Sequence, residues 1–381
     1  RDPRGELVTL AFVVNSGSSS IKWELLEVES GESVRRGIVE RIGEAGGDAA
    51  DHRQAMTSII GMLGDEHPVV IGHRVVHGGD LFSAATVVTP EVEAAIEKLS
   101  ALAPLHNPPN LAGIRAAQVA FPGIPNVAVF DTAFHQSLAP AAYTYAIDAR
   151  VAAEHSVRRY GFHGTSYQYV SRRAAEVIGR PLDELRLIVF HLGNGASACA
   201  IAGGRSVDTS MGMTPLEGLV MGTRSGDLDP GVLFHLAREA GLTTPELDTL
   251  LNRRSGILGL SGHGDMRDLV DTMKAGDAAS RLAFDVYVHR LRHYLGAYLA
   301  QLGGVDAIVF TAGVGENSPD VRAGALAGLG GLGIHLDAAR NASRSPEPRR
   351  ISTDDSPVAL LVVPTNEELE IARQSLAALA G

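Results

Sequence analysis

The sequence predicts an α/β fold built from two similar halves, and three observations support this prediction. Short runs of β-branched and other apolar residues alternate with stretches whose apolar residues recur at helical spacing. The chain has 381 residues, more than one compact domain usually contains, so two domains are expected. A strand pattern, a turn rich in Gly, Ser and Asn, and a second strand pattern occur together twice, at residues 13–20 and 189–197.

The expected elements follow the chain in alternating order. The apolar runs predict strands over residues 8–14, 22–28, 69–76, 126–130, 187–191, 197–201, 307–311 and 358–363. Helical spacing predicts helices over residues 90–100, 109–121, 164–178, 231–239, 244–253, 281–302 and 367–380. The longest of these helices has an apolar stripe that suits a core or a contact between subunits, made of Leu282, Val286, Leu291, Leu295 and Leu299.

Composition excludes several classes of protein. The sequence has 33 basic and 44 acidic side chains, a formal net charge of -11, whereas a general nucleic-acid binder normally has a basic excess. Cys199 is the only cysteine in the sequence, so an intrachain disulfide and a cysteine-based zinc site are excluded. No apolar run approaches the roughly 20 residues that cross a bilayer, so no membrane partner is expected. A reducing cytoplasm fits this cysteine content best.

The two repeated turns are candidates for phosphate binding. They read VVNSGSSS at residues 13–20 and VFHLGNGAS at residues 189–197, and neither contains a P-loop. Backbone N–H groups and hydroxyls in such turns can bind phosphate oxygens. Either turn alone could be an ordinary hairpin, but their matching positions in the two halves favour a phosphate site.

The segment GHRVVHGG at residues 72–79 supplies the first candidate charged group. His73 and His77 have the spacing of a helical metal site, but in a strand they lie roughly 13 Å apart, too far to share an ion. Strand geometry places Arg74 and Val76 on one face, which suits a small substrate with a charged head and an apolar tail. The alternative is a surface arginine beside a core valine.

Three further polar residues stand where strands or loops end. Asp131 follows a buried strand, where α/β folds place their chemistry, but it could equally cap a helix. His163, in YGFHGTS at residues 160–166, could donate to an anionic oxygen or cap a helix. Arg224 lies in a glycine-flanked loop with few apolar neighbours, which indicates a ligand anion as its partner.

Two glycine-rich turns and one acidic pair are the remaining candidates for nucleotide and metal binding. GHGDMR at residues 262–267 and AGVGEN at residues 312–317 contain no GxGxxG fingerprint, and they favour close approach of the backbone to a purine nucleotide. Glu367, in PTNEE, could help to place a magnesium ion or could be the first acidic residue of the last helix, where the helix dipole favours it.

Taken together, these motifs resemble the acetate kinase family, which includes propionate and butyrate kinases. The motifs that match in family order from residue 15 to residue 368 are NSGSSSIK, GHRVVHGG, PLHNPPN, FDTAFH, YGFHGTS, HLGNGAS, MGTRSGD, FTAGVGEN and TNEE. The resemblance implies an actin-like fold of two RNase H-like domains with the active site in the cleft between them. The first domain would be residues 1–135 with the C-terminal helix 368–381. The second would be residues 136–367, binding nucleotide and forming a homodimer.

The resemblance also implies roles for the matching residues. Asn15 and Glu367 would lie at a Mg²⁺ ion, which Mn²⁺ could replace. The catalytic groups would be Arg74, Asp131, His163 and Arg224, and Arg74 would also bind substrate. Acetate would contact Val76, Leu105, Phe162 and Pro215, with His106 and Asn194 at further active-site positions. ATP and ADP would bind Ser18, Ser20, Lys22, His191, Leu192, Gly193, Asn194, Gly195, Asp265, Met266, Arg267, Gly313, Val314, Gly315, Glu316 and Asn317.

The implied reaction is direct in-line transfer of the γ-phosphoryl group of ATP to acetate, reversibly giving acetyl phosphate and ADP. Acetate is already ionised at pH 7, so it needs no general base, and the difficulty is to bring two anions together. We expect Arg74 and Arg224, one from each domain, to offset that charge while Asp131 orients Arg74 or a metal-bound water. The alternatives are a propionate or butyrate kinase, or an actin-like ATPase that uses nucleotide as a conformational switch.

Overall fold

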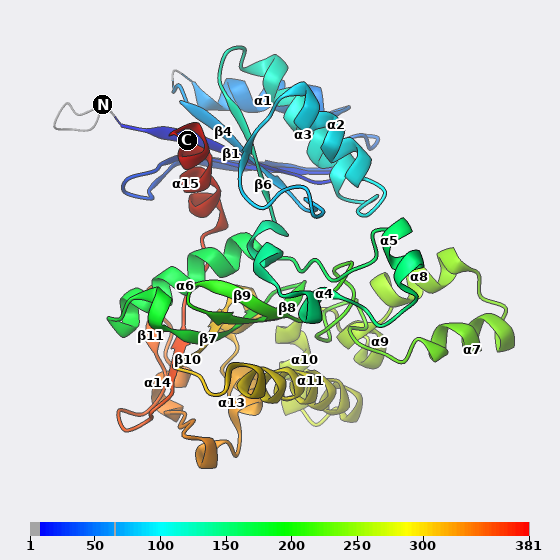
Figure 1. The fold of residues 1–381 in the computed structure, drawn as a ribbon, viewed down its shortest axis with the longest axis vertical. Coiled ribbons are helices and arrows are strands. Elements are labelled where there is room, and N and C mark those ends of the chain that lie inside the picture. The colour runs from blue at the N-terminus through cyan, green and yellow to red at the C-terminus, as the bar shows by residue number, and fades with distance from the viewer. Residues whose placement is uncertain (1–7, 65, 381) are drawn as a thin grey trace. The chain divides into compact units, whose positions relative to one another are not determined.

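The computed structural model describes residues 8–64 and 66–380 and divides the chain into two compact units (Figure 1). Unit 1 comprises Arg1–Gln136, Gly164–Ser166 and Asn366–Gly381, and unit 2 comprises Ser137–His163 and Tyr167–Thr365. The first predicted domain begins at residue 1 and ends at residue 381, so its extreme ends lie outside the described residues.

Unit 1 contains a six-stranded mixed sheet in the order β3-β2-β1-β4-β6-β5. Its strands are β1 (Leu10–Ser16), β2 (Ile21–Glu27), β3 (Ser33–Val39), β4 (Val70–Val75), β5 (Thr86–Val87) and β6 (Asn126–Phe130). The first three strands form an antiparallel meander, and β1, β4 and β6 are parallel. The carboxyl ends of these parallel strands therefore lie along one edge of the sheet.

Side-chain alternation along the strands assigns the two faces of this sheet. Phe12, Val14 and Ile71 belong to the core that packs on α1 (His52–Leu63) and α3 (Asn107–Ala120), while α15 (Glu367–Ala380) packs on β4 (Figure 1). A Cβ atom at Gly72 would lie 2.7 Å from Ile371 Cγ2, so the close approach of α15 requires glycine there. Because faces alternate, Arg74 lies on the α15 face.

Smaller elements complete unit 1 near the edge of its sheet where the parallel strands end. Helix α2 (Pro90–Leu99) begins with Thr89 as its N-cap and packs beside α3. Phe82 stacks on Phe130 at a ring-centroid distance of 4.3 Å, and a 3₁₀ helix follows β6 at Ala133–Ser137. This packing fixes the segment that carries Asp131.

Unit 2 repeats the same connectivity in a second six-stranded sheet, in the order β11-β12-β10-β7-β8-β9. Its strands are β7 (Arg186–Leu192), β8 (Ala196–Ala202), β9 (Arg205–Thr209), β10 (Ala307–Thr311), β11 (Arg349–Arg350) and β12 (Ala359–Val362). Strands β7, β8 and β9 form an antiparallel meander, and β7, β10 and β12 are parallel. The predicted duplication of an α/β unit is confirmed by this match of strand order and direction.

The helices of unit 2 are more numerous than the sequence predicted. They are α4 (Pro140–Tyr143), α5 (Ala149–Glu154), α6 (Gly164–Ile178), α7 (Gly231–Glu239), α8 (Thr244–Arg253), α9 (Gly256–Ser261), α10 (Met266–Lys274), α11 (Ala278–Leu302), α12 (Ala312–Asn317), α13 (Pro319–Leu326) and α14 (Ala338–Ala342), with the first three residues of α6 assigned to unit 1. None of the described helices combines the length and apolar character that a bilayer crossing requires.

The apolar stripe predicted on α11 divides into two parts. Leu291 and Leu295 are buried in the core, whereas Leu282 is 57% exposed and Val286 is 36% exposed. The buried face of the amino-terminal half is instead formed by Ala283, Phe284, Tyr287 and Val288. The carboxyl-terminal half of the stripe is therefore a core contact.

The sequence analysis did not predict the edge strands β3, β5, β9 and β11, nor helix α1 in the cover of the first sheet. Strand β3 exposes most of its residues on both faces because it is an edge strand, so it lacks the alternation that marks a half-buried strand. Strand β9 is also an edge strand. Helix α1 buries Ala55, Met56, Ile59 and Leu63, which recur at helical spacing, but the helix was not predicted.

Candidate active site

Arg74 and Asp131 form an ion pair at the carboxyl edge of the unit 1 sheet. Arg74 lies near the end of β4, and Asp131 follows the parallel neighbour β6 directly. Arg74 donates from Nε to Asp131 Oδ1 at 3.0 Å and from Nη2 to Oδ2 at 2.7 Å. Asp131 is 1% exposed, and its charge raises the pKa of Arg74 further above its ordinary value. Such a two-point contact fixes the direction of the guanidinium plane.

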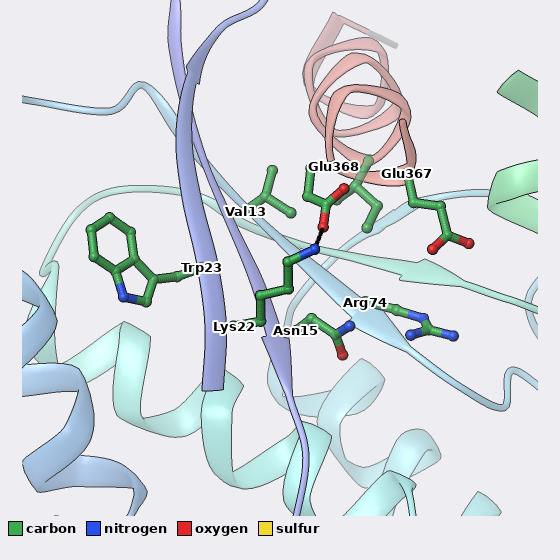
Figure 2. Close-up of a pocket in the computed structure, with 8 residues that line it drawn as sticks. Val13, Asn15, Lys22, Trp23, Arg74, Glu367 and Glu368 are labelled. Atoms are coloured by element: carbon green, nitrogen blue, oxygen red, sulfur yellow. Dashed lines mark hydrogen bonds and ion pairs between the residues drawn. The ribbon is translucent and has the colours of Figure 1, made fainter. Parts of the chain in front are cut away.

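A small pocket lies beside this pair, between β1, β2, β4 and the first turn of α15 (Figure 2). Asn15, Lys22, Arg74, Glu367 and Glu368 all line it, and Lys22 donates to Glu368. The two candidate interpretations of Glu367 are therefore compatible, because the residue begins α15 and also lines the pocket.

Glu367 has a carboxylate oxygen with no partner inside the described part of the chain. Its Oε1 is buried and accepts no hydrogen bond from any described residue. Burial raises the pKa of Glu367 to about 7, although the nearby Arg74 charge opposes that shift. A buried acceptor without a donor indicates that a ligand or cation completes the site.

Asn15 and Glu367 fit a hard divalent cation. They offer an amide oxygen and a carboxylate oxygen in one pocket, the oxygen donors that magnesium prefers. Within residues 8–64 and 66–380, no cluster of three or more His, Cys, Asp or Glu side chains has a metal-binding arrangement. This donor set suits magnesium, which usually takes one or two carboxylates and completes its shell with water and substrate phosphate oxygens.

In unit 2, His163 lies beside the β7–β8 turn. Its imidazole stacks on that of His191 with ring centroids 4.1 Å apart, and its Nδ1 lies 2.8 Å from Ser197 Oγ. His163 begins α6 with a left-handed backbone, φ 59°, and its side chain makes no capping hydrogen bond. His163 is therefore the N-cap residue of α6, as one alternative predicted, but its imidazole does not make the capping contact.

Arg224 also approaches the β7–β8 turn, and it has no carboxylate partner among the described residues. A Cβ atom at Gly195 would lie 2.9 Å from Arg224 Nη2 and 3.4 Å from His163 Nε2. Arg224 Nη1 donates to the Pro215 carbonyl at 2.6 Å, and burial lowers the pKa of Arg224 because no anion compensates for it. A half-buried guanidinium of this kind can bind a ligand anion, as the sequence indicated.

A cavity of about 770 Å³ in unit 2 collects most of the residues expected to bind nucleotide. Those that line it are Gly193, Asn194, Asp265, Met266, Arg267, Gly313, Val314 and Asn317. His191, Leu192, Gly195, Gly315 and Glu316 belong to the same strands and turns without lining it. The sequence analysis missed Lys274, Asp320 and Arg344, which also line the cavity. Their spacing in the chain gives no common motif.

The remaining expected residues lie in separate segments of the two units. Ser18 is exposed and Ser20 half-buried in the β1–β2 turn, and Leu105 and His106 are exposed before α3. Val76 is half-buried just beyond β4. In unit 2, Phe162 is buried and Pro215 is half-buried.

Asn110 is a site-supporting residue that the sequence analysis did not assign. Its Oδ1 accepts from the Val76 backbone N–H at 3.0 Å, and its Nδ2 donates to the Ser16 carbonyl at 2.7 Å. It therefore ties the end of β1 to the residue that follows Arg74 and Val75. Asn110 ends the motif PLHNPPN, directly after Pro108 and Pro109, but the sequence analysis gave it no role. Its 3% exposure marks it as a buried polar residue once the fold is known.

Known proteins resemble this chain in sequence and in fold. Residues 10–373 match the Acetokinase family. An acetate kinase from Leifsonia xyli subsp. xyli is 62% identical, with 98% of this chain and 100% of that protein covered. The crystal structure of Porphyromonas gingivalis acetate kinase matches with a TM-score of 0.93 at 42% identity, covering 97% of this chain and 100% of that one. A propionate kinase from Francisella tularensis matches with a TM-score of 0.91 at 37% identity, covering 97% and 99%.

Proposed function

The chain belongs to the acetokinase family, and on that premise we propose that it transfers the γ-phosphoryl group of ATP reversibly to acetate, giving acetyl phosphate and ADP. The two six-stranded sheets are the duplicated actin-like ATPase fold of that family. The enzyme is a phosphotransferase with a carboxyl group as acceptor.

The observation that carries the proposed mechanism is the contrast between the two arginines. Arg74 is held by the buried carboxylate of Asp131, whereas Arg224 contacts only a carbonyl oxygen in the described chain. We propose that both guanidinium groups offset charge on the transferred phosphoryl oxygens, and that His163 donates a hydrogen bond there. Acetate is ionised at neutral pH, so Asp131 orients Arg74 and is not required as a base.

The acceptor and the nucleotide use the other expected residues. We propose that Val76, Leu105, Phe162 and Pro215 contact the acetate methyl group, with His106 and Asn194 beside it. ATP binds through the β1–β2 turn at Ser18, Ser20 and Lys22, and through the cavity that Arg267, Gly313 and Asn317 line. Glycines at such a cavity leave backbone N–H groups accessible to phosphate oxygens.

We propose that Asn15 and Glu367 hold a magnesium ion, which manganese can replace. The orphaned buried oxygen of Glu367 and its raised pKa support this assignment, because a cation would compensate for the buried carboxylate. When bound, such an ion neutralises charge on the phosphate oxygens. Lys22 and Glu368 pair in the same pocket, and their opposite charges shift the pKa of Glu367 in opposite directions.

We also propose that the protein is a homodimer that works in the cytoplasm. The exposed apolar side chains of Leu282 and Val286 on α11, with Val232 and Phe234 on α7, support a subunit contact through unit 2. The ATP requirement and the single buried thiol of Cys199 suit a reducing, nucleotide-rich compartment.

An acceptor panel tests the proposed function. The purified protein is given ATP and magnesium with acetate, propionate, butyrate or no acceptor, and ADP release and acyl phosphate are both measured. We expect acyl phosphate with acetate and little ADP without an acceptor. One methylene changes transition-state binding by about 1–3 kcal/mol, so a propionate kinase would reverse the order of acetate and propionate. ADP release that ignores the acceptor would instead favour an ATPase switch.

A further inference from the structure

Outside the groups assigned above, unit 2 contains a polar cluster centred on Arg159. Arg159 Nη2 donates to Glu217 Oε1 at 2.6 Å. Its Nη1 lies within hydrogen-bond distance of three consecutive carbonyl oxygens, those of Thr209 at 3.0 Å, Ser210 at 3.2 Å and Met211 at 3.0 Å. The Arg159 side chain is only 16% exposed. One guanidinium group therefore holds both ends of the segment 209–217.

Tyr145 completes this cluster from the other side of the segment. Its hydroxyl donates to Glu217 Oε2 and accepts from the Met213 backbone N–H at 3.1 Å. Burial raises the pKa of Tyr145, so the phenol stays protonated and remains a donor. The segment passes so close that a Cβ atom at Gly212 would lie 2.1 Å from the Tyr145 hydroxyl and 1.7 Å from Glu217 Oε2. Only glycine fits at that point.

The held segment contacts two parts of the proposed active site directly. The Gly212 carbonyl accepts from the backbone N–H groups of Tyr160 at 3.0 Å and Gly161 at 3.2 Å, which immediately precede Phe162 and His163. The Pro215 carbonyl accepts from Arg224 Nη1 at 2.6 Å. Displacement of segment 209–217 would therefore move the acceptor of Arg224 and the backbone beside His163 together.

We propose that Arg159, with Glu217 and Tyr145, is a positioning residue for phosphoryl transfer, because it sets segment 209–217 so that the Pro215 carbonyl orients the Arg224 guanidinium. This inference rests on the proposed function. Arginine is required because its planar fork reaches a carboxylate and several carbonyls at once, which a lysine ammonium cannot do. Arg159, Glu217 and Tyr145 do not line the 770 Å³ cavity, so nucleotide binding does not depend on them.

Kinetics of the conservative variants Arg159→Lys and Tyr145→Phe test this inference. We expect Arg159→Lys to lower kcat with acetate about 30-fold, and Tyr145→Phe about 5-fold, while KM for ATP stays within twofold of wild type. Arg158→Lys is the matched control. Its guanidinium lies 3.6 Å above the Tyr143 ring and makes no hydrogen bond with segment 209–217 within the described residues, so kcat should not change. Tyr145→Phe keeps the test decisive if Arg159→Lys does not fold.

A double variant distinguishes positioning from a merely structural role. If Arg159 acts through Arg224, then Arg159→Lys combined with Arg224→Ala should be no slower than Arg224→Ala alone, because the orienting contact is already lost. Independent, multiplying losses would overturn the inference, as would an Arg159→Lys variant with wild-type kcat and only a lowered Tm. A wild-type enzyme that leaves acetate unphosphorylated would refute the proposed function instead.

Discussion

The two sheets have the same strand order, yet the carboxyl edges of their parallel strands carry different chemistry. In unit 1, β4 and β6 end in the paired charges of Arg74 and Asp131. In unit 2, β10 is followed by the small residues of α12, and β7 leads into the Gly-Asn-Gly turn at residues 193–195. The strand framework alone therefore does not decide which chemistry an edge supports.

The same contrast distinguishes the two arginines. Arg74 is oriented by a buried carboxylate that already compensates for part of its charge. Arg224 has its nearest polar contact in a neutral carbonyl, so its whole charge is available to a ligand. A paired arginine offers fixed geometry, and an uncompensated one offers stronger attraction for an incoming anion.

The largest expected effect is at Arg224. We expect Arg224→Ala to lower kcat with acetate by about 10³-fold, because a guanidinium without a carboxylate partner gives its full charge to the transition state. ADP release with acetate should be measured together with Tm from thermal unfolding. Tm should change little or rise, because the variant removes a partly buried cation. Wild-type turnover in this variant would remove Arg224 from the mechanism.

A smaller loss of activity, with a clear loss of stability, is expected at Asp131. Asp131→Ala leaves Arg74 half-buried without its partner, so we expect a kcat about 10²-fold lower and a free energy of unfolding lower by about 3 kcal/mol. The control is Glu368→Ala, which breaks the more exposed pair with Lys22 and should change stability by no more than about 1 kcal/mol. Equal losses in the two variants would contradict the contrast between buried and exposed pairs.

The two hairpin turns allow a sharper comparison. A methyl group at Gly195 would lie only 2.9 Å from Arg224 Nη2 and would displace it, so we expect Gly195→Ala to lower kcat about 10-fold. Tm should change little, because the displaced atoms are at the ends of flexible side chains. At Gly17 the nearest atoms are Ser20 O at 3.4 Å and Ser20 Oγ at 3.5 Å, which is ordinary contact. Gly17→Ala should therefore leave kcat nearly unchanged. Equal losses of kcat in the two variants would contradict the expected difference between the two turns.

The smallest expected effect is a pH dependence of stability at Glu367. Because its pKa is raised from 4.5 to about 7, the folded chain holds this proton more tightly than the unfolded chain does. The resulting stabilisation is complete below about pH 4.5 and is lost as the pH rises to about 7. In EDTA, the stability of Glu367→Gln relative to wild type should rise by about 1 kcal/mol or more between pH 5 and pH 8, because the variant lacks the titrating carboxylate. A difference that is constant with pH would refute the raised pKa.

Much of the fold could be predicted because most of its strands are buried and each is visible as a continuous run of apolar residues. The runs that became β1, β4, β6, β7, β8, β10 and β12 are apolar over most of their length, which a sequence shows directly. The edge strands β3 and β9 could not be found in this way, since an exposed edge needs no apolar alternation. The repeated hairpin also indicated the duplication before any strand order was known.

The site was predictable in its residue types and less so in its contacts. Arg74 and Asp131 were both chosen, but their two-point contact depends on parallel pairing of strands more than 50 residues apart. For His163, the sequence left a helix cap and a hydrogen-bond donor as equal alternatives. The structure places His163 at the N-cap position of α6, but its imidazole stacks on His191 and makes no capping hydrogen bond. Asn110 ends the motif PLHNPPN, but that motif did not indicate its contacts, and Arg159 lies outside the matching motifs.

The sequence by itself determined the α/β class, the repeated hairpin and the chemical groups available at the strand ends, because these depend on residue identity and local period. Only the tertiary structure decided that Arg74 is compensated by a carboxylate, that Arg224 is not, and that Arg159 holds the segment whose carbonyl orients Arg224. The physical reason is that electrostatic compensation depends on the distance between atoms, and residues 57 positions apart come together only through strand register.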